Sequence, residues 1–290
     1  MSLHDAYARR TPFELAFRDR ESADALVRAV EEESAGRGAD HGSLDAFVTM
    51  GAVESFVRDL AGPDAPAGAI REYGALAFQA FHFTRIGCPL FLLSTHVARF
   101  LVEGAPDGDP VPAESAGYLQ FPRHLFWVRQ GEGEPPESVD GVFWTATDAD
   151  FLHSLIVTGV RPDRPGLGIV PLPAAPLAES RDWLDVDARG DGTDFSNDMP
   201  GGEIDVLYAF TTSGELLKLL ARFFAYVQTV PSALEERPGS RDDSRGGGAE
   251  VPVDGPEAGD RLVAGGQPPA GAEAEPEPSA LPFIRVTLDG

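Results

Sequence analysis

The segment Tyr118-Leu-Gln-Phe-Pro-Arg-His-Leu-Phe-Trp-Val-Arg129, followed closely by Gly141-Val-Phe-Trp-Thr-Ala-Thr147, decides the fold class of this chain. Both stretches are rich in aromatic and aliphatic residues and are bounded by glycine or proline, a pattern that predicts β-strands. Residues 167–172 and 204–210 have the same character. The second half of the chain is therefore predicted to contain a β-sheet.

The sequence before this segment has helical periodicity. Apolar residues recur at i, i+3, i+4 and i+7, and Ser43 is a suitable N-cap before one such run. This spacing predicts helices over residues 22–35, 43–61 and 67–86, and the last of these is expected to be broken or kinked by Pro89 before residues 90–101. In the third helix, Ile70, Tyr73, Ala77 and Phe81 are expected to share one buried face.

Two of the predicted strands are followed by a capping-box pattern. Thr147 has Asp150 three residues later, and Thr212 has Glu215 three residues later, so a helix is expected after each, the second over residues 213–228. The chain thus has helices first and strands later, which favours an α+β fold. We expect a helical N-terminal layer, residues 1–104, packed on a mixed sheet formed within residues 105–230 of the same body.

The C-terminal part of the sequence changes character twice. Residues 231–280 contain 8 Pro and 9 Gly, scattered acidic residues and no aromatic residue, which predicts a disordered acidic linker. Residues 281–290 form a short apolar peptide, with Phe283, Ile284, Val286 and Leu288 as its candidate partner-binding residues. This tethered peptide would dock on a partner by strand addition, return as an edge strand of its own sheet, or stay disordered.

The charge and cysteine content restrict the partners and the compartment. The net charge is −24 and there is no basic run, which argues against nucleic acid and against anionic membranes as partners. Cys88 is the single cysteine, so no disulfide can form within the chain and a cytoplasmic location is expected. No uninterrupted apolar stretch is long enough to predict a membrane span.

The sequence lacks the motifs of the common enzyme families. The sequence has no P-loop, no G-x-G-x-x-G, no H-E-x-x-H and no G-x-S-x-G. Asp148, Asp150 and His153 form the best catalytic candidate, because they would lie together where a strand leads into a helix and would hold a metal or transfer protons. The alternative is that the two aspartates cap that helix and His153 packs beneath it.

An acidic segment, residues 185–198, resembles a calcium-binding loop. Asp187, Asp191 and Asp198 would occupy ligand positions, although Arg189 stands where an acid or amide belongs. The alternative is a solvated acidic loop without a bound ion. No cofactor is expected, and a divalent cation at this loop is the exception considered.

Two further groups of residues have a functional and a purely structural interpretation. Seven aromatic residues between Tyr118 and Phe151 would line an apolar ligand pocket or fill the core. His82 and His96 would meet in a helical hairpin or remain separate core histidines. We predict a non-catalytic adaptor or accessory protein that binds a protein partner; the alternative is a metal-assisted hydrolase or a binder of small apolar ligands that uses residues 118–153.

Overall fold

The computed structural model describes residues 25, 27–32, 35, 50–104, 106–122, 125–129, 136–147, 151–160, 167–185, 208–210, 213–237 and 283–288. Residues 27–32 are helical. They are followed by α4 (Met50–Ala61), α5 (Ala67–Arg85), β1 (Leu90–Leu93), α6 (Thr95–Glu103), β2 (Ala116–Gln120), β3 (Phe126–Val128), β4 (Glu137–Ser138), β5 (Gly141–Thr147), β6 (Phe151–Val160), β7 (Leu167–Pro171), β8 (Ala175–Pro176), η2 (Leu177–Glu179), α7 (Ser180–Trp183), β9 (Tyr208–Phe210), α8 (Ser213–Thr229), η4 (Pro231–Ala233), β10 (Leu234–Arg237) and β11 (Phe283–Val286).

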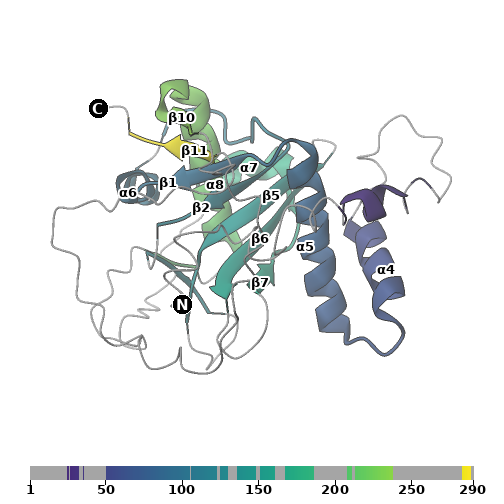
Figure 1. Cartoon of the computed structure of the whole chain (residues 1–290). Coiled ribbons are helices and arrows are strands. Elements are labelled where there is room, and N and C mark those ends of the chain that lie inside the picture. Colours follow the sequence, from purple (N-terminus) through teal and green to yellow (C-terminus); the bar gives the residue numbers. More distant parts are fainter. Residues whose placement is uncertain are drawn as a thin grey trace, which may run out of the picture.

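The main sheet is mixed, as the sequence predicts. Its strands lie in the order β10-β11-β1-β2-β5-β6-β7, and β8 also pairs with β6 (Figure 1). β1 is parallel to both of its neighbours, β11 and β2, whereas the remaining pairs of this sheet are antiparallel. A second, small sheet has the order β4-β3-β9. The α+β fold class is therefore confirmed.

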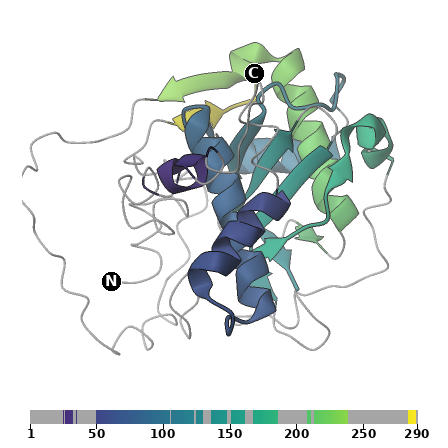
Figure 2. The same cartoon turned by 90° about the vertical axis from the view of Figure 1, so that its right-hand side faces the viewer.

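Helices cover both faces of the main sheet. α5 packs on one face and α8 on the other (Figure 2), and α6 contacts α8 and contributes to the same core cluster. Successive side chains of β5 alternate between the two layers, because strand residues point to opposite faces. Phe143 joins the cluster under α5, whereas Val142 and Trp144 join the cluster under α8. The predicted single helical N-terminal layer is thus divided, since α6 lies on the face opposite α5.

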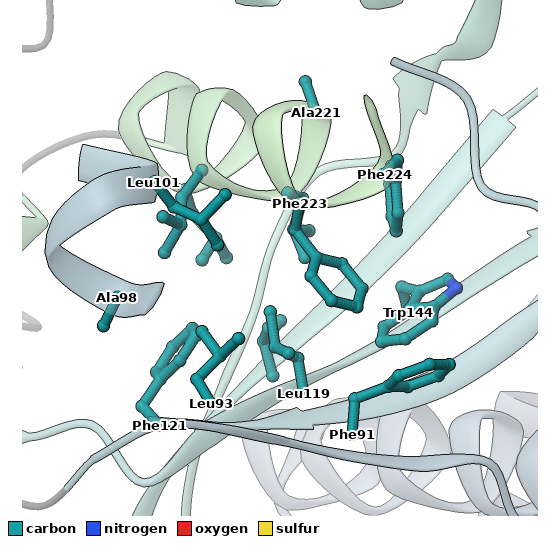
Figure 3. Close-up of a cluster of buried hydrophobic side chains, with 14 of the residues drawn as sticks. Phe91, Leu93, Ala98, Leu101, Leu119, Phe121, Trp144, Ala221, Phe223 and Phe224 are labelled. Carbon is teal, nitrogen blue, oxygen red and sulfur yellow. The ribbon is translucent and has the colours of Figure 1, made fainter. Parts of the chain in front are cut away.

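The larger core cluster lies between α8 and the sheet. Phe223 and Phe224 point from α8 toward the ring of Trp144, and Phe91 lies beside it on β1 (Figure 3). Gly117 is paired with Trp144 across β2 and β5, and a Cβ atom at Gly117 would collide with the indole. Because glycine has no Cβ atom, Gly117 leaves room for the indole ring of Trp144.

Residues 90–93 form β1, so the prediction that residues 90–101 are helical is wrong for the first four of them. Gly87 and Cys88 both have positive φ, 89° and 61°, which ends α5 and reverses the chain. Ser94 then accepts a hydrogen bond from the backbone N–H of Val97 and caps α6. A short apolar run is compatible with either element, and here the reversal at 87–88 directs it into the sheet.

Two other expectations about the strands need correction. The segment 118–129 is two strands in two different sheets, separated by Pro122, which has no N–H to donate to a ladder. The helix expected after Thr147 is absent among the described residues 151–160, which form β6 instead. Because β6 is buried on both faces, its apolar run shows little of the alternation that identifies a half-buried strand.

The other helices agree with the sequence more closely. α5 and α8 match the predicted ranges 67–86 and 213–228 within one residue at each end. Tyr73, which was expected on the buried face of α5, is 64% exposed, whereas Ile70, Ala77 and Phe81 of the same predicted face are buried. No helix in the described ranges is long and apolar enough to cross a membrane.

The predicted linker falls mostly outside the described residues. Its first seven residues form η4 and β10, so the body extends to Arg237 and not to 230. Residues 238–280 and the N-cap Ser43 lie outside the described part of the chain, and their predicted structure stays a prediction. The predicted C-terminal peptide contributes β11 to the main sheet.

Candidate functional site

The catalytic candidate His153 lies on a strand and not on a helix. It belongs to β6, and its Cα pairs with that of Thr145 on β5, beneath α5. Asp148 and Asp150, the two residues expected beside it, lie outside the described residues. Of the three residues in the predicted catalytic cluster, only His153 therefore lies in the described part of the chain.

Around His153 the structure brings together a buried polar cluster. The hydroxyl of Thr145 donates a hydrogen bond to Oε1 of Gln79 over 2.7 Å, and Nε2 of Gln79 donates to the backbone carbonyl of His153 over 3.1 Å. The ring of Phe78 stands edge-on between two imidazoles, 5.0 Å from that of His153 and 4.7 Å from that of His82. We call Gln79, His82, Thr145 and His153 the α5 polar cluster.

The α5 polar cluster fixes the helix on the sheet. Gln79 and Thr145 are both 1% exposed, and an amide or hydroxyl buried without a partner would cost free energy. Their hydrogen bonds bind α5 to β5 and β6 at one register. Burial lowers the pKa of the His153 imidazole, so its neutral form is favoured. Within the described residues no group of three or more His, Cys, Asp or Glu side chains is arranged to hold a metal ion.

The lowered pKa of His153 predicts a pH-dependent stability. The folded chain binds this proton less readily than the unfolded chain, whose imidazole has the ordinary value of 6.5. The stability from neutral His153 is therefore complete above that pH and falls as the pH falls through the lowered pKa. Urea unfolding followed by circular dichroism between pH 5 and 8 measures this loss. His153→Gln should reduce the pH dependence, and equal slopes in the two proteins would contradict the assignment.

Replacement of Thr145 by valine is expected to destabilise the fold by about 1–3 kcal/mol. Valine keeps the shape of threonine but removes the hydroxyl, which leaves Oε1 of the buried Gln79 without its donor. Chemical denaturation measures the loss, and Thr145→Ser, which keeps the hydroxyl, is the matched control. Equal stability of the valine and serine variants would show that this hydrogen bond contributes nothing.

Sequence reasoning missed Gln79 and Thr145. A signal for Gln79 was present, because it is the single amide in the otherwise apolar and aromatic stretch Gly74-Ala-Leu-Ala-Phe-Gln-Ala-Phe-His-Phe83. A polar side chain in such a stretch needs a partner when it is buried. The identity of that partner depends on the packing of α5 on β5, which the local sequence does not contain.

The other sequence candidates are placed as follows. Asp187, Asp191 and Asp198 of the acidic loop lie outside the described residues. Six of the seven aromatic residues between 118 and 151 are buried in the core, and the seventh, Phe151, is 45% exposed. His82 and His96 do not meet, because α5 and α6 lie on opposite faces of the main sheet.

The C-terminal strand β11 has an internal place in the main sheet. It pairs parallel to β1, with Ile284 opposite Phe91 and Val286 opposite Leu93, and antiparallel to β10. Of the three possibilities left open by the sequence, the structure has the return to the same body, but between two strands and not at the edge. The main chain of Phe283 belongs to β11 as well.

Side chains and backbone groups beyond the two neighbouring strands also bind this segment. Val286 is completely buried in the core cluster under α8, and Ile284 packs against the same cluster. The hydroxyl of Tyr226 donates to the carbonyl of Thr287 over 2.7 Å, and the N–H of Thr287 donates to the carbonyl of Ala233 over 2.9 Å. We call β1, β10, Tyr226 and Ala233 together the β11 seat.

Comparisons with known proteins add little. No protein-family model and no curated protein sequence matches this chain. A solved structure titled "Crystal structure of AcrVA2" is similar at 11% sequence identity and a TM-score of 0.36, over 78% of this chain and 69% of that chain. A TM-score this low assigns neither a fold family nor a function.

Proposed function

We propose that this protein is a non-catalytic adaptor or accessory protein that binds a protein partner, and that its C-terminal strand controls this binding. The observation that carries the proposal is the position of β11. A strand that follows Arg237 after 45 residues (238–282) completes the sheet between β1 and β10. The tethered peptide predicted from the sequence therefore has a specific place in which it docks on its own body.

Strand addition is a common mode of peptide recognition. The position of β11 in the sheet suits a protein that binds its partner in this way. Hydrogen bonds of the main chain supply affinity, and pockets for alternate side chains supply specificity. A partner would compete either for β11 itself or for the β11 seat. The acidic composition favours a protein partner over nucleic acid, and a cytoplasmic location belongs to the same proposal.

Neither hydrolysis at His153 nor the binding of a small apolar ligand by the aromatic residues is favoured as a second function. His153 lies on a strand beneath α5, and the rings expected to line an apolar pocket pack against other core rings. No specific observation favours hydrolysis or the binding of a small apolar ligand. We therefore propose binding of a protein and not catalysis.

Chemical cross-linking in the cells from which the sequence comes would test the proposal. The intact chain, Ile284→Asp and the surface control Tyr73→Ala would each be captured through an N-terminal tag, and the cross-linked proteins identified by mass spectrometry. We expect a protein whose captured amount changes with Ile284→Asp and not with Tyr73→Ala. A loss would mean that the partner binds β11, and a gain would mean that it uses the β11 seat. Equal capture by all three proteins would contradict the proposal.

A further inference from the structure

We draw no further inference here: the strongest candidate, the α5 polar cluster between α5 and the main sheet, where the ring of Phe78 stands between the imidazoles of His82 and His153, belongs to the site already described and carries no more than the pH dependence of stability derived there for His153.

Discussion

Deletion of residues 281–290 is expected to lower the free energy of unfolding by about 3–5 kcal/mol, because it removes an internal strand of the main sheet. Val286 is fully buried and Ile284 packs against the same core cluster, so both apolar contacts are lost. The deletion also leaves β1 and β10 without their shared neighbour. For a body of this size the loss corresponds to a fall in melting temperature of about 10 °C, measurable by circular dichroism.

Leu288 provides the matched control for the deletion. It follows β11 and is 40% exposed, so Leu288→Ala should change the stability by less than about 0.5 kcal/mol. Val286→Ala should have an intermediate effect, since it shortens one buried side chain and keeps the strand. A truncated chain that melts within about one degree of the intact chain would show that β11 contributes nothing to the sheet.

Trp144→Ala is expected to destabilise the protein by about 3–5 kcal/mol. The indole lies with its ring centroid 5.6 Å from that of Phe91, 5.8 Å from that of Phe223 and 5.5 Å from that of Phe224, and its N–H donates to the carbonyl of Glu114. Its removal would leave a cavity between β5 and α8 that these rings cannot fill without moving. Urea unfolding followed by far-ultraviolet circular dichroism measures the effect.

The control for Trp144 comes from the same predicted aromatic group. Phe151 is 45% exposed, so Phe151→Ala should have a much smaller effect on stability. The two variants separate the two interpretations of the group, because rings that line an open ligand pocket contribute less to stability than rings of the core. Equal and small effects of both variants would contradict the core assignment of Trp144.

Gly117→Ala is expected to disturb the packing of Trp144 from the neighbouring strand β2. The added Cβ would collide with the ring of Trp144, and such overpacking costs about 1–3 kcal/mol. In the background of Trp144→Ala the collision is removed, so the same substitution should cost less. A double-mutant cycle measures this coupling, and additive effects would contradict a direct contact between the two positions.

Several elements could be predicted because their local pattern is strong. α8 presents Leu216, Leu219, Leu220 and Phe223 at helical spacing, and all four are buried. β5 has the predicted bounds, since an aromatic run between glycine and a turn fits a pleated strand. These elements are long or sharply bounded, so that periodicity and turn residues specify them without their neighbours.

The candidate site was predicted less completely. His153 was recognised as a residue of interest, but on a helix, because Thr147 and Asp150 imitate the start of one. Its neighbours Gln79 and Thr145 were not identified, since hydrogen bonds between residues 66 positions apart leave no mark in local spacing. The strand β6 is buried on both faces, which hides the alternation that would have revealed it.

The sequence by itself determined the fold class, the long amphipathic helices and the apolar character of residues 281–290, because each depends on local composition and spacing. Only the tertiary structure decided that β1 is a strand, that α5 and α8 cover opposite faces of the sheet and that β11 lies between β1 and β10. The physical reason is that strand pairing uses backbone groups common to all residues. The partner of a strand is therefore selected by packing across the whole chain, as when Ile284 pairs with Phe91.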